Sequence, residues 1–272
     1  MGIKISTYYY KPKECKPSDM NLAEAIEEIA LNYPSYGYRR ITAALKRQGL
    51  KVNHKRVLRL MRDKNLLCRA QKVFKATTDS SHGLAKYPNL IEDLIPYRTD
   101  QIWHADITYI RIATSFVYLS ALVDGFSRKV VGYGLGRTLS ADLVISALLD
   151  AISKRNTDSL IHHSDQGIQY CSADYVKILK DHDIDISMSG KANPYDNAKI
   201  ESFFRTLKVE EVYMFEYETY AEVLERIPYF IEEVYNSKRL HSSLGYMPPE
   251  EFENINNEKI KTNESHQLIL TS

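Results

Sequence analysis

Three short strings, each carrying one acidic residue, constrain the fold of this chain more than any other feature. Trp103–Asp106 begins a run rich in β-branched and aromatic residues, and His163–Gly167 ends a second apolar run. Asn197–Phe204 has the apolar spacing of a helix. Thirty-five residues (positions 166–200) separate the second acidic residue from the third. A fold that uses all three strings together must combine strands and helices in one α/β unit.

The expected elements of the middle of the chain alternate in a defined order: three strands, then helix, strand, helix, strand and helix. They cover residues 101–112, 116–123, 129–135, 141–154, 160–163, 173–180, 184–188 and the run from Asn197. This order is that of a ribonuclease H-like fold, a mixed five-stranded sheet with flanking helices. Within it, Asp106 lies mid-strand on the face shared with Ile102, His104 and Thr108. Asp165 lies just past the carboxyl end of a strand, where ligands of α/β sheets gather.

Each acidic residue also has an ordinary structural explanation. Asp106 could be a solvated side chain on an open sheet face, and Asp165, followed by Gln-Gly, could only form a turn. Glu201 could be one more exposed helix glutamate. Its helix favours a functional role, because one face is apolar and a second stripe carries polar and charged residues. The apolar face comprises Ile200, Phe203, Phe204 and Leu207, and the polar stripe comprises Asn197, Glu201 and Lys208.

Three carboxylates that converge on one point match the chemistry of divalent metal ions. Mg²⁺ takes hard oxygen ligands in octahedral geometry and completes its shell with water and phosphate. Asp106, Asp165 and Glu201 are therefore candidate catalytic and metal-binding residues for Mg²⁺ or Mn²⁺.

The positive charge is concentrated in the first quarter of the chain. Residues 1–75 contain 17 Lys and Arg against 6 Asp and Glu, although the whole chain has a net charge of only +1. Such a segment is typical of a nucleic-acid contact. Helices are expected over 22–31, 38–48 and 54–66, with Gly49 ending the second and Asn53 capping the third. This pattern predicts either a helix-turn-helix or a basic surface helix that clamps DNA without sequence preference.

The candidate DNA-binding residues come from four places in the sequence. Two lie at the start of the second helix, four on the third helix, and one each in the carboxylate-bearing helix and near the carboxyl terminus: Arg39, Arg40, Lys55, Arg56, Arg59, Arg62, Lys208 and Arg239. Arg239 follows a long helix expected over 219–235, where it could contact DNA or satisfy the last carbonyl groups of that helix.

Composition suggests four segments. These are a basic helical region (1–69), a linker (70–99), the ribonuclease H-like core with a C-terminal helix (100–253) and a flexible tail (254–272). Cys15, Cys68 and Cys171 lack paired spacing, so neither a zinc site nor a disulfide framework is expected. No apolar run is long enough for a membrane span and no signal peptide is evident, which predicts a cytoplasmic location.

The stretch from about Tyr33 to Phe252 resembles the catalytic OrfB product of bacterial insertion sequences, in the group named after insertion sequence three. The resemblance rests on the three acidic strings with their integrase-like spacing, on residues 36–41 (Tyr-Gly-Tyr-Arg-Arg-Ile), and on residues 235–249, from Tyr-Asn-Ser-Lys-Arg-Leu-His to Met-Pro-Pro. It implies an integrase catalytic core whose Asp106, Asp165 and Glu201 hold two metal ions for phosphoryl transfer.

The implied function is DNA strand cleavage and strand transfer by a transposase, in which water or a DNA 3′-hydroxyl attacks a phosphodiester. The implied partners are the element ends and target DNA, further copies of this chain on DNA, and an upstream OrfA product or a fusion with it. Two alternatives remain open: a plain nuclease of the same fold, and a noncatalytic DNA-binding repressor derived from a transposase. A Tyr or Ser recombinase is disfavoured, because no Arg-His-Arg constellation accompanies the twenty tyrosines.

Overall fold

The computed structural model describes residues 17–67, 85–190 and 197–258. The chain divides into two compact units, Met1–Ala70 and Gln71–Ser272. None of the helices in these described stretches combines the length and apolarity that crossing a bilayer requires.

The first unit contains three helices: α2 (Pro17–Asn32), α3 (Tyr38–Arg47) and α4 (His54–Asp63). One apolar face of each helix is buried against the others, which confirms the helices expected from the apolar spacing. Gly49 has a φ of 85°, a left-handed conformation that glycine adopts freely, and it ends α3 as predicted. The side chain of Asn53 caps α4, accepting a hydrogen bond from the Lys55 backbone N–H at 2.9 Å.

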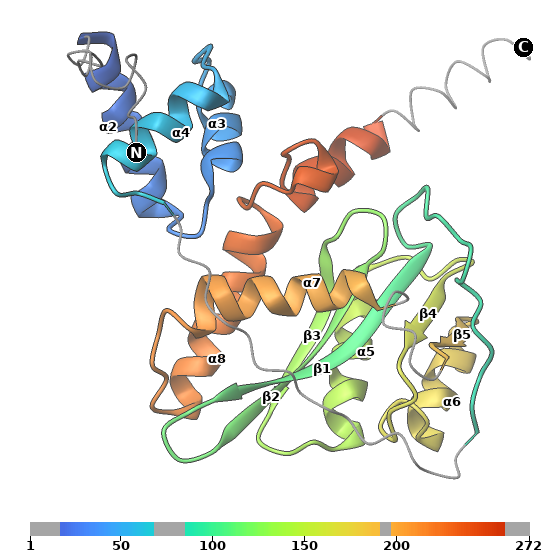
Figure 1. Ribbon diagram of the computed structural model, residues 1–272. Helices are drawn as coiled ribbons and strands as arrows, with labels where there is room; N and C mark the ends of the chain where they lie inside the picture. Colours follow the sequence, from blue (N-terminus) through green and yellow to red (C-terminus); the bar gives the residue numbers. More distant parts are fainter. Residues whose placement is uncertain (1–16, 68–84, 191–196, 259–272) are drawn as a thin grey trace, which may run out of the picture. The chain divides into compact units, whose positions relative to one another are not determined.

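The second unit is built on a five-stranded sheet with the order β3-β2-β1-β4-β5. Strands β1 (Ile102–Arg111), β2 (Phe116–Asp124) and β3 (Val130–Gly136) form an antiparallel meander. Strands β4 (Ile161–Ser164) and β5 (Asp185–Met188) extend it in parallel to β1. The mixed sheet and its element order confirm the ribonuclease H-like expectation (Figure 1).

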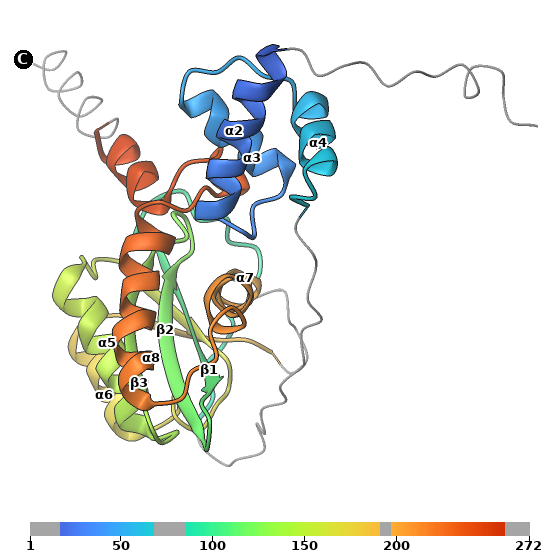
Figure 2. The same cartoon turned by 90° about the vertical axis from the view of Figure 1, so that its left-hand side faces the viewer.

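Helices cover both faces of this sheet (Figures 1 and 2). α5 (Ala141–Lys154) and α6 (Ala173–Asp181) pack on the face that includes Trp103 and Ala105. α7 (Ala198–Leu207) and α8 (Tyr220–Tyr229) pack on the opposite face, which includes Ile110. Because side chains alternate along a strand, Asp106 faces the same side as Ile110, toward α7.

Two local features explain the close packing of β3. A Cβ atom at Gly132 would lie 2.5 Å from the Ala147 carbonyl oxygen, so only glycine lets α5 approach this strand. The side-chain amide of Asn236 exchanges two hydrogen bonds with the backbone of Val130, both 3.0 Å.

Asn236 ends a segment of wider π-helical turns, Phe230–Asn236, which continues α8. The long helix expected over 219–235 therefore forms, but its second half is wound differently after Pro228, whose ring lacks a backbone N–H.

The sequence placed a linker at residues 70–99 and a flexible tail at 254–272. Within the linker, residues 88–90 lie beside β5, where the Leu90 N–H donates to Ser187 Oγ (2.9 Å) and the Met188 N–H donates to the Pro88 carbonyl (3.2 Å). At the other end, helical structure continues through residue 258. Residues 68–84 and 259–272, including Cys68, lie outside the described residues, as does Cys15.

Candidate active site

Asp106 lies in the middle of β1, opposite Ala121 of β2. Its side chain is half-buried on the sheet face that α7 covers, and its carboxylate accepts a hydrogen bond from the Ile107 backbone N–H at 2.7 Å. A central strand with partners on both sides holds this position firmly, because β1 pairs with β2 on one edge and with β4 on the other.

Asp165 reaches the same region through strand pairing. β4 runs parallel to β1 in a register that sets Ser164 beside Ala105. The next residue along each strand is therefore an aspartate, Asp165 on one and Asp106 on the other. The Asp165 carboxylate accepts a hydrogen bond from the Gly167 N–H at 2.8 Å, and a Cβ at Gly167 would lie 2.9 Å from the same carboxylate oxygen. The glycine of this string thus makes room for the carboxylate.

Glu201 lies in the first turn of α7 and has an exposed side chain. The apolar face predicted for this helix is buried as expected, at Ile200, Phe203, Phe204 and Leu207. That burial fixes the rotation of α7, so the orientation of Glu201 follows from the packing of its neighbours.

The pKa of Asp106 shows that the three carboxylates interact. Burial raises its pKa to about 7, and the negative charges of Asp165 and then Glu201 add to the rise. The Ile107 N–H and the Lys208 ammonium oppose it. Three elements that are distant in sequence therefore bring like charges close enough to interact.

The donor set fits a hard divalent cation, because its oxygens repel one another and a cation would relieve that repulsion. Across residues 17–67, 85–190 and 197–258, however, no three acidic, His or Cys side chains lie close enough to enclose one ion. Within these ranges the three carboxylates interact electrostatically without forming a closed cage around one ion.

Three basic residues, His104, His163 and Lys199, each lie two positions before one of the acidic residues, and sequence reasoning assigned them no role. Both histidines are buried. The rings of His104 and His163 lie 5.8 Å apart, and His163 Nδ1 is 2.8 Å from Ser187 Oγ. Burial lowers the pKa of His163 to about 4, and that of His104 falls well below its usual value for the same reason. Burial also lowers the pKa of Lys199 to about 8. The period-2 spacing of His104 with Asp106 was the available signal.

The six DNA-contact candidates of the first unit fall into two groups. Arg39, Lys55 and Arg62 have exposed side chains, while Arg40 is half-buried, with its guanidinium 5.4 Å from the Tyr36 ring centroid. Arg56 and Arg59 instead bind an acidic side chain of α2: Arg56 Nε donates to Asp19 Oδ1 (2.7 Å) and Arg59 Nη2 donates to Asp19 Oδ2 (2.8 Å). These two guanidinium groups cross-link α4 to α2.

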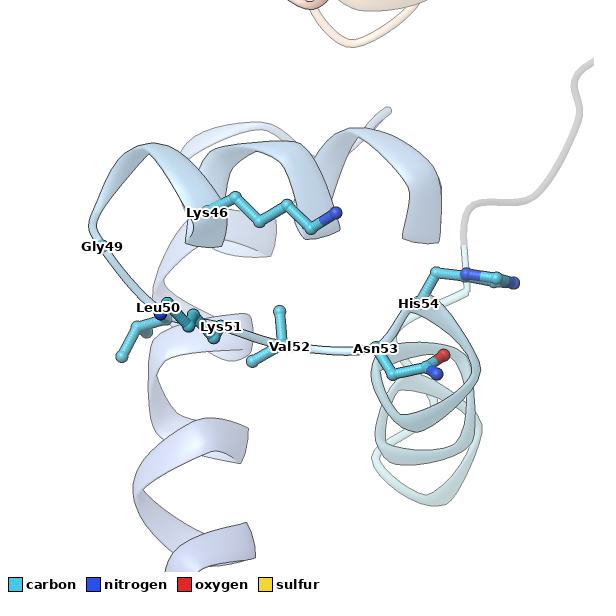
Figure 3. A pocket seen from close by; sticks show the side chains of 7 residues that line it. All are labelled: Lys46, Gly49, Leu50, Lys51, Val52, Asn53 and His54. Carbon is cyan, nitrogen blue, oxygen red and sulfur yellow. The ribbon is translucent and has the colours of Figure 1, made fainter.

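The structure adds three polar residues that sequence reasoning did not select. Lys46, Lys51 and His54 line a concave surface where the chain passes from α3 to α4 (Figure 3). Lys46 extends across this surface from α3, and His54 lies at the first turn of α4. Positions 46 and 51 lie outside the helix expected over 54–66, which carries four of the predicted DNA contacts.

The two candidates of the second unit have different surroundings. The Lys208 ammonium lies 4.8 Å from the Tyr109 ring centroid and is close enough to Asp106 to lower the pKa of that carboxyl group. Arg239 is only 4% exposed, and its guanidinium donates to both carboxylate oxygens of Glu210 at 2.8 and 2.7 Å. The expectation of a DNA contact at Arg239 therefore does not match its place in this fold, because Glu210 and the surrounding core already occupy the guanidinium.

Family models match nearly all of the described chain. The model of an HTH-like domain matches residues 17–74, and two models of an integrase core domain match residues 96–194 and 182–249. The transposase for insertion sequence element IS904 of Lactococcus lactis is 38% identical over 239 residues, which cover 86% of this chain and 94% of the relative. The transposase InsF for insertion sequence IS3A of Escherichia coli is 39% identical over 224 residues, covering 81% and 77%.

Among solved structures, the catalytic core domain of HTLV-2 integrase in complex with magnesium covers 57% of this chain and 97% of its own length, at 16% identity and a TM-score of 0.45. The fold found here, the matched domains and the two transposases agree on one assignment. The chain belongs to the OrfB-type transposases of the IS3 family, polynucleotidyl transferases of the DDE type that combine an integrase catalytic core with an HTH-like domain and act on DNA in transposition.

Proposed function

We propose that Asp106, Asp165 and Glu201 are the catalytic triad of this transposase and bind two divalent metal ions, Mg²⁺ or Mn²⁺. The observation that carries the proposal is the pKa of Asp106, raised to about 7 by burial and by the charges of the other two carboxylates. Three elements that are distant in sequence each supply one of the interacting acidic residues. Such an unfavourable concentration of charge is typical of a functional site rather than of a structural core.

The bound ions would supply activation of the attacking hydroxyl and stabilisation of the leaving 3′-oxygen. The chain itself contributes position and charge. Asp106, on the central strand, is the most firmly held ligand, and Asp165 is fixed beside it by the Gly167 N–H. Lys208, near Asp106, is placed to bind a phosphate oxygen of the DNA strand that enters the site.

Glu201 gives the sharpest test, because its exposed side chain is the least constrained of the three. We expect Glu201→Gln to reduce strand cleavage and strand transfer by at least ~10³-fold, as loss of one member of a catalytic unit commonly does. Activity of the parent protein should vanish in EDTA and return with Mg²⁺ or Mn²⁺. Glu225→Gln, at an exposed position of α8, is the matched control and should leave activity unchanged. Cleavage by Glu201→Gln within tenfold of the parent would refute the triad.

The helical unit, residues 1–69 in our division of the chain, is proposed to bind double-stranded DNA at the element ends. Its exposed Arg39, Lys55 and Arg62, together with Lys46 and Lys51 of the turn, supply the phosphate contacts. This function also places the protein with the bacterial chromosome, in the cytoplasm.

We further propose that transposition requires several copies of this chain on DNA and an upstream OrfA product, separate or fused. A single small helix-turn-helix buries too little surface to combine affinity with specificity. Gel-shift titrations should therefore show weak binding by the isolated chain, with little preference for an element end over scrambled DNA. A preference above ~10³-fold by this chain alone would contradict the need for a partner.

A further inference from the structure

A groove of about 650 Å³ lies at the far end of the β1–β2 hairpin from the strand pairing with β4. Its walls come from the hairpin and from the segment that follows α7, which lie at the same end of the second unit in both views (Figures 1 and 2). The side chains that matter here are Tyr109, Arg111, Phe116, Lys208, Tyr213 and Phe215.

Aromatic rings are left exposed in this groove. Tyr109, Phe116, Tyr213 and Phe215 are 37%, 46%, 39% and 40% exposed, although each is large enough to fill a core position. Single exposed apolar side chains are common on protein surfaces, whereas a group of them at one place marks a binding surface. The groove therefore offers flat apolar faces to an occupant.

The rings are also held in place rather than free to collapse on one another. Tyr109 and Phe116 meet edge to face, with centroids 5.4 Å apart. The Arg226 guanidinium covers the ring of Phe215 at 3.4 Å and donates to Glu211 Oε1 at 2.7 Å. Tyr217 donates to the same carboxylate oxygen at 2.7 Å. These contacts fix the wall that carries Phe215 and Tyr213.

Two cations accompany the rings. Lys208 lies over Tyr109, which follows Asp106 by three residues in β1, and the charge of Lys208 also lowers the pKa of Asp106. Arg111 lines the groove as well, and Glu216 is the acidic side chain in its lining. Flat rings beside cations suit a ligand that has both π-faces and negative charge, which is the chemistry of a nucleotide.

We infer that this groove binds unpaired nucleobases of the DNA strand whose phosphodiester is held at the carboxylates. The bases stack on Tyr213 and Phe116, and the adjoining phosphates contact Lys208 and Arg111. The inference rests on the proposed function, because it uses the carboxylate site to place the strand. Stacking of this kind tolerates any base, so the groove favours DNA that has opened at the reacting position without reading its sequence.

A protein partner is the other occupant that an exposed aromatic groove could take. Lys208 argues for DNA, because the cation that covers Tyr109 in the groove also interacts with the carboxylate of Asp106. A DNA strand bound at the carboxylates therefore continues into the aromatic groove.

The test uses the full chain in Ca²⁺ and two short DNAs of the same sequence, one fully paired and one with a short unpaired segment that contains 2-aminopurine. Stacking should quench the 2-aminopurine fluorescence. We expect Tyr213→Leu to weaken binding of the unpaired DNA about tenfold and to change binding of the duplex less than twofold. Tyr213→Phe keeps the ring and should bind as the parent does.

Tyr229→Leu is the matched control, since Tyr229 is an exposed tyrosine of the same unit with Lys238 6.0 Å from its ring centroid. It should bind both DNAs as the parent does. Unchanged quenching and unchanged affinity for unpaired DNA in a Tyr213→Leu, Phe116→Leu double variant would overturn the inference. So would equal losses for paired and unpaired DNA, which would point to a general phosphate surface.

Failure of the groove and failure of the triad give different results. Asp106→Asn should keep the quenching and the preference for unpaired DNA, whereas loss of that preference would count against the groove. A failure of the triad would show itself separately, as strand cleavage by Glu201→Gln.

Discussion

The two units of this protein place their charges in opposite ways. In the helical unit Arg39, Lys55 and Arg62 lie exposed on the surface of α3 and α4. In the catalytic unit Asp106 lies on the sheet face covered by α7, where burial and the charges of Asp165 and Glu201 raise its pKa to about 7. Charges at a surface contribute separately and modestly, whereas charges brought together in a site depend on one another.

The same contrast explains why arginines differ in role between the units. Arg62 is exposed on α4, and salt would screen its interactions. Arg239 is buried against Glu210 in a two-pronged ion pair. Arginines of the two units thus differ in burial: one is available at the surface, and the other is held in the core by a carboxylate.

The largest effect is expected at the triad. Asp165→Asn should lower strand transfer by at least ~10³-fold, because the carboxylates act as one unit. Asp174→Asn, which changes an exposed aspartate at the start of α6, should leave strand transfer near that of the parent. Equal losses of activity in both variants would contradict a catalytic role for Asp165.

The next effect concerns the buried ion pair. Arg239→Ala should lower the free energy of unfolding by about 3 kcal/mol, because Glu210 is left buried without its partner. Urea titration followed by circular dichroism measures this. Lys238→Ala, a neighbouring exposed cation paired with Glu233, should cost less than 1 kcal/mol. Equal and small losses would mean that Arg239 is not structural.

A smaller effect should appear in the pH dependence of stability. The pKa of Asp106 is about 7 in the folded state and 3.8 in its unperturbed state, so the folded protein retains a proton that the unfolded chain has lost between these values. Without metal, stability should therefore fall as pH rises from about 4 to about 7. Asp106→Asn removes this penalty and should melt a few °C higher than the parent at pH 8, but not at pH 4.

Calorimetry in EDTA across this range tests the sign. Added Mg²⁺ should raise the melting temperature of the parent more than that of Asp106→Asn, because a ligand stabilises the form that binds it. A parent that is as stable at pH 8 as its Asn variant would show that the carboxylates do not interact as the fold implies.

The smallest effects are expected in the helical unit. Lys55→Ala and Arg62→Ala should each weaken DNA binding a few-fold and reduce the salt slope by about one unit, as loss of one phosphate contact does. Arg56→Ala and Arg59→Ala should instead act on stability, because their partner is Asp19, whose pKa these two guanidinium groups lower. Binding isotherms at several salt concentrations, paired with thermal melts, separate the two groups.

The sequence predicted much of the fold because its signals are local. Alternating apolar residues located the strands, and the apolar face of α7 was visible in the spacing of Ile200, Phe203 and Leu207. Asn53 and Gly49 marked helix ends through their own hydrogen-bonding and backbone preferences. The three acidic strings were recognisable for the same reason, since each sits in a distinctive local context.

Other features depended on residues that are distant in sequence. The charge of Arg56, Arg59 and Arg239 did not reveal whether they contact DNA, because their acidic partners are distant in sequence. Asp19 lies 37 residues from Arg56 and 40 from Arg59. Glu210 lies 29 residues from Arg239. The aromatic groove joins the β1–β2 hairpin to the segment after α7, about a hundred positions away. The sequence by itself determined which elements form and which residues have suitable chemistry. Only the tertiary structure decided which of those residues are buried, paired or exposed, because burial and electrostatic interaction depend on neighbours in space.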